Sequence, residues 1–526
     1  MNINKFVMNN IEYSLLMIYM LCDAETKSHN TKRIKYNIVL ILVDDLRYLS
    51  NETVYLPNIQ MMVERGISFK YAYAQQAQCV PSRNSLFAGR RPDSLRLYDS
   101  YGYQVTPARK FITLPQFLKK RGYMTYSVGK VFEMNESLRD NKHYPYIWSK
   151  APYYPPSNKY KDAAVCDVYK SQKLKNNLIC PIVTAKQPNQ TLPDLEILSE
   201  SIRILKKNNS MKPFFLAVGF QKPHIPLKFP KKYVERIPLS RVRPPISPSI
   251  PTKMPLVAWH PWMDIRHRDD IQRLHILFPM GVMPEKWILK IRQSYYAAAL
   301  FIDDLVGELI THINRKNTII VLTSDHGFSL GENGLWSKYS NFDVALRVPL
   351  IFNIPGMKSK SISMPVELID LFPTLTELLE LDKDISKCKH HDTSKLCFDG
   401  KSLVPLLNTQ LQSKLFTGQP FAFSQYPRPS VNPWGNTCKP FLKDIKIMGY
   451  SIRTDKYRYT EWVSFNNTSF QRNWSSIYGY ELYDHVDDPE ESNNVYSDKD
   501  YKKLAKRLSN LLRSHVERGI YSFNDL

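Results

Sequence analysis

The chain lacks several features that would place it in a simple class. Its 526 residues show no internal repeat and no low-complexity tract, which argues against a repeat protein or a disordered chain. Beyond the first 24 residues, no apolar run is long enough to cross a bilayer, so we expect no stable membrane insertion. Hydrophobic residues make up 43% of the chain, as in ordinary globular proteins, and the length favours one large domain and a smaller one.

Acidic residues are in short supply. The chain has 49 Asp and Glu against 72 Lys and Arg, a formal net charge of +23. Such an excess favours a polyanionic partner, for example nucleic acid, an acidic membrane surface or a sulfated glycan. The basic residues are scattered and no base-reading motif accompanies them, so we expect no nucleic-acid partner. A solvated basic surface without a partner is an equal alternative.

Cysteines are few, and none stands in a Cys-x-x-Cys cluster, which disfavours a zinc site. Cys166 and Cys180 enclose a short polar loop, as do Cys388 and Cys397. Two local disulfides are therefore the simplest pairing. This pairing leaves Cys438 as a free thiol.

The first 24 residues have the pattern of a signal peptide. Lys5 precedes a short apolar run at residues 14–21, and the small residue Ala24 follows. A protein with such a leader enters the secretory route, where disulfides persist. Sequons for N-glycosylation agree with that route, and they stand at Asn51, Asn135, Asn189, Asn208, Asn466, Asn467 and Asn473.

Three apolar runs predict buried parallel strands at residues 37–43, 214–219 and 318–323. Each run ends at polar, ligand-type residues, and open α/β sheets place their sites along this edge. Helical spacing at residues 114–120, 291–313 and 366–379 places helices among the strands. We therefore predict an α/β domain over residues 33–410, with a large, mostly parallel mixed sheet flanked by helices.

The remainder of the chain has a different sequence pattern. Residues 408–419 are largely polar and predict an exposed connection. Beyond them, aromatic-rich strand patterns such as residues 457–462 precede a helix around residues 500–518. We predict a smaller α+β subdomain over residues 420–526.

The most informative motif is Cys79-Val80-Pro81-Ser82-Arg83, followed by Gly-Arg-Arg-Pro at residues 89–92. Alone it also fits a small buried cysteine at a helix start. Two further pairs, Asp44-Asp45 and Asp325-His326, each follow a predicted strand. A salt bridge or a helix cap would explain either pair by itself. Together they predict a metal site, and oxygen-rich ligands favour Ca²⁺ or Mg²⁺.

With these motifs the chain resembles the iduronate-2-sulfatase branch of the sulfatase family, within the alkaline-phosphatase-like superfamily. The resemblance runs from residue 37 to about residue 483. It rests on residues 43–47, 78–99, 127–132, 222–226, 261–266, 324–327, 336–343, 424–430 and 443–454.

The resemblance implies the alkaline-phosphatase-like fold and a sulfatase that removes the 2-O-sulfate from iduronate of heparan and dermatan sulfate. A formylglycine-generating enzyme would oxidise Cys79 to formylglycine. One hydroxyl of the hydrated aldehyde takes the sulfate, and the other then expels it. A single Ca²⁺ would be held by the modified Cys79 together with four further ligands, namely Asp44, Asp45, Asp325 and His326. Such a protein is lysosomal or secreted.

The resemblance also assigns roles to the basic residues. Arg83 would hydrogen-bond one hydroxyl of the hydrated aldehyde and favour its deprotonation. Lys130 and Lys338 would clamp the sulfate oxygens. Lys222 and His224 would lie near the ester oxygen, with His224 as the proton donor to the departing alcohol.

Two positions depart from the family pattern. The family has a histidine directly after the Gly-Lys-Val-Phe segment, where this chain has Glu133, and a second histidine is replaced by Asn333. A carboxylate at position 133 would repel the sulfate group. The alternative function is therefore a secreted, catalytically impaired glycan-binding protein. A phosphatase is disfavoured, because Cys79 stands where those enzymes use serine or threonine and the ligands for a second metal are missing.

Overall fold

The structure is a computed structural model. It describes residues 36–50, 54–101, 111–132, 144–166, 175–207, 212–383, 385–388, 396–407, 421–436 and 438–518. The predicted signal peptide, the predicted connection at residues 408–419 and Glu133 lie outside the described residues.

The described strands are β1 Asn37–Val43, β2 Ile67–Tyr73, β3 Met124–Gly129, β4 Ile179–Ile182, β5 Phe214–Phe220, β6 Leu227–Pro230, β7 Thr318–Ser324, β8 Ser329–Leu330, β9 Trp336–Ser337, β10 Arg347–Asn353, β11 Lys360–Ile362, β12 Val366–Glu367, β13 Ser386–Lys387, β14 Cys397–Phe398, β15 Ala422–Arg428, β16 Ile447–Arg453, β17 Tyr457–Phe465 and β18 Arg472–Asp484. The described α-helices are α2 Pro57–Arg65, α3 Cys79–Ala88, α4 Pro92–Leu95, α6 Leu114–Lys120, α7 Tyr144–Ile147, α8 Pro193–Lys207, α9 Lys232–Glu235, α10 Met263–Arg266, α11 Asp269–Gln272, α12 Glu285–Thr311, α13 Asp343–Leu346, α14 Leu371–Leu378, α15 Val404–Leu407 and α16 Lys502–Arg518.

An eight-stranded sheet forms the centre of the molecule, in the order β11-β2-β10-β7-β1-β5-β3 with β12 also paired to β2. Strands β7, β1, β5 and β3 are parallel neighbours. Of these eight strands, β10 alone runs against the others. The predicted large, mostly parallel mixed sheet is therefore confirmed.

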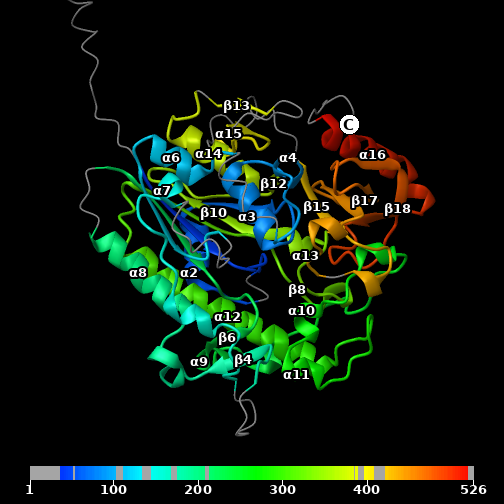
Figure 1. Ribbon diagram of the computed structural model, residues 1–526, viewed down its shortest axis with the longest axis horizontal. Coiled ribbons are helices and arrows are strands. Elements are labelled where there is room, and N and C mark those ends of the chain that lie inside the picture. Colours follow the sequence, from blue (N-terminus) through cyan, green and yellow to red (C-terminus); the bar gives the residue numbers. More distant parts are fainter. Residues whose placement is uncertain are drawn as a thin grey trace, which may run out of the picture. The chain divides into compact units, whose positions relative to one another are not determined.

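Helices cover both faces of this sheet (Figure 1). Side chains of β1 alternate between the two hydrophobic cores, with Val39 and Ile41 in one and Ile38 and Leu40 in the other. Helices α2, α8 and α12 contribute to the first core, and α3, α6, α14 and α15 contribute to the second. Because both faces are covered, the strands need apolar residues at every position, which explains the continuous apolar runs of the sequence.

A second, antiparallel sheet follows near the carboxyl end, in the order β15-β16-β17-β18. Helix α16 packs on it through apolar residues at helical spacing, such as Leu508 and Leu512, which form a separate hydrophobic core with residues of the sheet. Residues 36–526 nevertheless cluster as one compact unit. The C-terminal α+β architecture agrees with the prediction, while the boundary between residues 410 and 420 stays a prediction.

Most predicted elements appear close to their predicted bounds, with one difference. The helix predicted at residues 366–379 begins only at Leu371, because Val366 and Glu367 pair with β2 instead. Both predicted disulfides are present, Cys166–Cys180 and Cys388–Cys397, and Cys438 is free. No described helix is both long enough and apolar enough to cross a membrane.

The junction between β3 and the residues after it depends on a glycine. Gly129 has a φ of +78°, and a Cβ at this position would lie 2.4 Å from the carbonyl oxygen of Gly219 and 2.6 Å from Cδ1 of Ile197. A larger side chain would be strained and would also push apart β3, β5 and α8.

We predict that Gly129→Ala lowers the free energy of unfolding by about 2 kcal/mol or more, because a positive φ and a steric clash add up. Gly122→Ala is the matched control, since Gly122 has a φ of +91° but nothing within 4 Å of the added Cβ. Urea unfolding of both variants checks this. Equal losses for the two variants would contradict the role of the clash.

Candidate active site

The predicted site residues gather at the carboxyl edge of the parallel strands. They are Asp44 and Asp45 after β1, Lys130 after β3, Lys222 and His224 after β5, Asp325 and His326 after β7, Lys338 after β9, and Cys79 and Arg83 in the first two turns of α3. Since the strands are parallel and adjacent, their carboxyl ends meet at one edge. Except for Lys222, the contacts below bring these side chains together around Cys79.

Cys79 lies at the centre of the group. Its Sγ is 3.3 Å from Nζ of Lys338, 3.4 Å from Nε2 of His326, 3.7 Å from Nζ of Lys130 and 3.8 Å from Oδ1 of Asp44. Burial raises the pKa of the thiol to about 12, although both lysines oppose the shift. The unmodified group is thus a protonated thiol and a weak nucleophile.

Arg83 connects the helix to two strand ends. Its side chain is fully buried, and its guanidinium donates to Oδ1 of Asp44 at 2.8 Å and to Oδ2 of Asp325 at 2.9 Å. It also donates to the backbone carbonyls of Lys130 and Val131. One planar cation therefore holds α3, β1, β7 and the end of β3 in register.

Four side chains present ligand atoms for a cation. Atoms of Asp45, Cys79, Asp325 and His326 all lie within 4.8 Å of one another, and all four residues are buried. His326 holds its Nδ1 3.0 Å from the carbonyl oxygen of Gly327, which leaves Nε2 facing the group. Burial lowers the pKa of His326, so its imidazole is neutral and able to coordinate.

The same group contains an unsatisfied oxygen. Oδ2 of Asp45 is buried and accepts no hydrogen bond. Burial raises the pKa of this carboxyl group, although Lys338 opposes the shift. A buried oxygen without a partner costs free energy, and a bound cation would satisfy it. The donors at this edge therefore fit a metal ion.

Two lysines pair with the acids around Cys79. Lys130 Nζ is 2.8 Å from Oδ2 of Asp44, and Lys338 Nζ is 2.6 Å from Oδ1 of Asp45. Burial alone would lower the pKa of Lys338, but Asp45 and Cys79 outweigh it and hold the pKa well above its usual value. Burial would likewise raise the pKa of Asp44, yet Lys130, His224 and Arg83 hold it well below its usual value. Lys338 and Asp44 therefore remain charged.

Lys222 and His224 follow β5 and make hydrogen bonds within their own loop. The Lys222 ammonium donates to the carbonyl oxygens of His224 and of Pro226, the latter at 2.8 Å, so it is directed into its own loop. His224 places its Nδ1 2.6 Å from the carbonyl oxygen of Ile225 and its Nε2 4.0 Å from Oδ2 of Asp45. Burial, with Lys161 and Lys338, holds the pKa of His224 well below its usual value.

Several supporting residues had no recognisable signal in the sequence. Asp194 at the start of α8 accepts a hydrogen bond from the Gln221 backbone at 2.6 Å and opposes the lowering of the Lys222 pKa, which burial brings to about 7. The hydroxyl of Tyr295 donates to the carbonyl oxygen of Asp45 at 2.6 Å. Asn333 is buried and donates to the carbonyl oxygen of Glu490 at 3.1 Å, a structural contact.

The segment of residues 336–343 carries Lys338 and is hydrogen-bonded to the C-terminal sheet. Its last residue, Asp343, accepts hydrogen bonds from Arg458 at 2.9 Å, Arg453 at 3.2 Å and the Tyr73 hydroxyl at 2.8 Å. Burial would raise the pKa of Asp343, but Arg453, His485 and Arg458 hold it well below its usual value. The position of Lys338 thus depends on strands β16 and β17.

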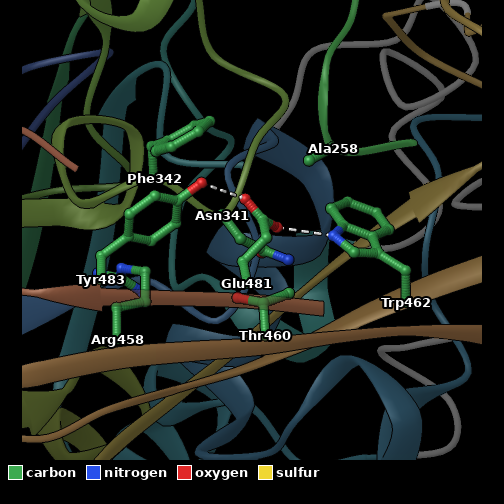
Figure 2. Close-up of a pocket in the computed structure, with 8 residues that line it drawn as sticks. All are labelled: Ala258, Asn341, Phe342, Arg458, Thr460, Trp462, Glu481 and Tyr483. Carbon is green, nitrogen blue, oxygen red and sulfur yellow. Dashed lines mark hydrogen bonds between the residues drawn. The ribbon is translucent and has the colours of Figure 1, made fainter. Parts of the chain in front are cut away.

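A small buried pocket lies between this segment and the sheet, with Glu481 at its centre (Figure 2). Its carboxylate accepts hydrogen bonds from Nε1 of Trp462 at 2.7 Å and from the Tyr483 hydroxyl at 2.8 Å. Burial raises the pKa of Glu481 to about 7, although both hydrogen bonds oppose the shift.

The fold and site together define a hydrolase of the alkaline-phosphatase-like class, with a nucleophile position at a helix start beside a metal-ligand group. Solved structures agree. A phosphonate monoester hydrolase from Silicibacter pomeroyi superposes with a TM-score of 0.68 at 20% identity, covering 92% of this chain and 96% of the other. A 2-O GAG sulfatase superposes with a TM-score of 0.60 at 20% identity, covering 94% of both chains. The predicted fold class is confirmed.

The sequence comparisons narrow the class to a family. The sulfatase family model matches residues 36–381, and the model for the N-sulphoglucosamine sulphohydrolase C-terminal region matches residues 331–518. Iduronate 2-sulfatase of Mus musculus is 41% identical over 95% of this chain and 98% of its own length. Iduronate 2-sulfatase of Homo sapiens is 41% identical over 92% and 95%.

The chain belongs to the sulfatase family and hydrolyses sulfate esters. Sulfatases generally depend on a metal ion and on a formylglycine, and the described site has a cysteine and a cation-fitting group where each would be needed.

We predict that Glu481→Gln makes folding stability less dependent on pH. The folded pKa of about 7 exceeds the ordinary glutamate value of 4.5, so this stabilising contribution is complete below about pH 4.5 and is lost as pH rises through about 7. Relative to the wild type, the variant should gain up to about 3 kcal/mol between about pH 5 and about pH 8.

Glu332→Gln is the control for this prediction. Burial would raise the Glu332 pKa, but Arg47 and Arg292 outweigh it and lower the pKa to about 2, so its loss of stability should be constant over the same range. Denaturant unfolding at several pH values measures both. A constant difference between Glu481→Gln and the wild type would contradict the prediction.

Proposed function

We propose that this sulfatase removes the 2-O-sulfate from iduronate residues of heparan and dermatan sulfate. The observation that carries the proposal is the position of Cys79, whose Sγ lies within 3.8 Å of Lys338, His326, Lys130 and Asp44. The substrate follows from the identity of 41% to two iduronate 2-sulfatases over nearly the whole chain. The formal net charge of +23 suits a polyanionic glycan.

The nucleophile is formed by oxidation of Cys79. A formylglycine-generating enzyme acts on the Cys79–Arg83 motif during maturation. The thiol itself is protonated, since burial raises its pKa to about 12, so modification is what makes the position reactive. When hydrated, formylglycine supplies one hydroxyl that accepts the sulfate and a second that releases it.

The metal is a single Ca²⁺, held by Asp44, Asp45, Asp325, His326 and the modified residue 79. The donors are mainly carboxylate oxygens, which calcium prefers. When bound, the ion supplies Lewis acidity toward the sulfate ester. The unsatisfied Oδ2 of Asp45 supports this assignment.

Charge balance explains how the site takes an anion. The negative charges of the three aspartates, Asp44, Asp45 and Asp325, are offset by three buried cations. These are Arg83, Lys130 and Lys338, and a divalent ion would add two positive charges. Lys130 and Lys338 are held at fixed positions by Asp44 and Asp45, so they stabilise negative charge on the sulfate oxygens without reorganising. Arg83 keeps Asp44 and Asp325 in place and favours an ionised oxygen at residue 79.

His224 donates the proton to the departing alcohol. In the structure its pKa is held low by burial and by Lys161 and Lys338. A bound sulfate ester brings negative charge beside the ring and raises that pKa, so the imidazole gains its proton in the complex. Lys222 supports this step by hydrogen-bonding the carbonyl oxygen of His224.

We propose that the protein reaches the lysosome or the exterior through the secretory route. Its two disulfides persist under oxidising conditions. Of two adjacent sequons, Asn466 is exposed, whereas the amide of Asn467 donates to the carbonyl oxygens of Lys443 and Ile445. Glycopeptide mapping should therefore find glycan at Asn466 and none at Asn467.

The function is tested with 4-methylumbelliferyl iduronide 2-sulfate and with mass spectrometry of the peptide containing residue 79. We expect formylglycine at residue 79 and sulfate release, both lost in Cys79→Ala. Lys338→Gln should lower kcat/KM about 100-fold or more, because a fixed cation at the developing charge is removed.

Lys253→Gln is the control, since Lys253 also pairs with an aspartate, Asp498, at 2.7 Å but at an exposed position. It should leave kcat/KM unchanged. An unmodified cysteine together with no sulfate release from the wild type would refute the proposal and favour the glycan-binding alternative.

Glu133 provides a further prediction from the sequence. The family has a histidine here, and a carboxylate repels the sulfate group. We expect Glu133→His to raise kcat about tenfold, with Glu133→Gln intermediate, because removal of the negative charge accounts for part of the gain. Steady-state kinetics of the three proteins measures this. A loss of activity in Glu133→His would show that the glutamate itself takes part in turnover.

A further inference from the structure

Two exposed aromatic rings form a stacked pair on the surface. The rings of Tyr101 and Phe441 have centroids 4.0 Å apart and planes inclined by 24°. Their exposed fractions are 43% and 46%. Trp434, in the same loop as Phe441, is 63% exposed. Aromatic side chains with one open face are typical of binding surfaces, because they offer a large contact area at low entropic cost.

The pair is held rigidly by one carboxylate. Asp99 accepts the backbone N–H of Tyr101 at 3.1 Å through Oδ1 and the backbone N–H of Leu442 at 2.7 Å through Oδ2. Residues 99–101 and 441–442 are therefore joined although they are far apart in the sequence. A ring platform that is already fixed loses little entropy when a ligand binds.

Both loops lead directly to the active site. The side chain of Gln78, the residue before Cys79, donates to the Ser100 hydroxyl at 2.7 Å. On the other side, the Tyr426 hydroxyl lies 3.4 Å from Oε1 of Gln78 and donates to the carbonyl oxygen of Cys438 at 2.7 Å. Ser100 precedes Tyr101, and Cys438 lies in the loop of Phe441. The loops that carry the stacked pair are thus linked by hydrogen bonds to the residue next to Cys79.

The surroundings of the pair are basic. Lys439, Lys443 and Lys446 are exposed in the same loop, and one exposed acid, Asp444, lies among them. Nζ of Lys443 is 5.8 Å from the centre of the Phe441 ring. The surface therefore combines flat apolar rings with ammonium groups. Pyranose rings present flat C–H faces and sulfated sugars add anionic groups at their edges, which matches this combination.

We propose that Tyr101, Phe441 and Trp434, with Lys443, bind the sugars that follow the sulfated residue in a sulfated glycan chain. The aromatic rings contact the C–H faces of these sugars, and the lysine pairs with a sulfate or carboxylate. This subsite rests on the proposed function, since it takes the remainder of the chain whose terminal sugar loses its sulfate. It makes the enzyme favour oligosaccharides over monosaccharides.

The test compares methyl iduronide 2-sulfate with a heparan-derived hexasaccharide that ends in the same sugar. For the hexasaccharide, Phe441→Ala and Tyr101→Ala should each raise KM about tenfold with kcat nearly unchanged, while kinetics on the methyl glycoside stay as in the wild type. Phe441→Trp, which keeps a ring, should retain the wild-type KM. Tyr146→Ala removes an exposed tyrosine, 70% accessible, on α7, which lies away from β15 (Figure 1). It should change neither substrate's KM.

The outcomes separate the two proposals. Failure of the wild type to release sulfate from either substrate would count against the proposed function. Release from both substrates with an unchanged KM in Phe441→Ala and Tyr101→Ala would overturn the subsite and leave the function standing. Dissociation of a wild-type dimer by Phe441→Ala, seen in analytical ultracentrifugation with unchanged hexasaccharide kinetics, would assign the rings to a second copy of the chain and also overturn the subsite.

Discussion

The buried guanidinium of Arg83 is the interaction on which the site depends. It binds the carboxylates of Asp44 and Asp325, which follow two different strands, from a position one turn into α3. Removing it would leave Asp325 without its arginine partner and Asp44 with Lys130 alone, and an unpaired buried charge is far more costly than the pair itself is stabilising. The same side chain fixes the distance between Cys79, at the start of α3, and the edge of the sheet.

The site is completed by elements from the other end of the chain. Lys338 is placed by a segment that ends at Asp343, and Asp343 is bound by arginines of β16 and β17. The C-terminal sheet therefore supports the candidate site. This agrees with two family models that overlap at residues 331–381. A chain that ended before the second sheet would keep the candidate metal ligands but lose the support of Lys338.

Burial has opposite consequences in different parts of this structure. Around Cys79, Lys130 and Arg83 keep Asp44 charged and Asp45 keeps Lys338 charged despite burial, whereas His326 is neutral. The charged pairs provide a fixed field. At Glu481 the partners are neutral donors, so burial dominates and the carboxyl group titrates near neutrality. The chain thus stabilises charged groups at the site that would bind an anionic substrate. In the pocket beside the C-terminal sheet it contains a carboxyl group whose charge is disfavoured, and this group contributes more to stability under acid conditions.

The sequence by itself determined three strands of the central sheet, the site motifs and the two disulfides. Continuous apolar runs need burial on both faces, and the polar residues that end them fall on one edge by topology alone. The sequence did not determine which partners the basic side chains of the site bind. Only the tertiary structure directs Lys222 into its own loop and brings Asp194, Tyr295 and Asp343 to support the site. It alone stacks Tyr101 on Phe441, because such contacts depend on side-chain direction and on segments hundreds of residues apart, which no local pattern records.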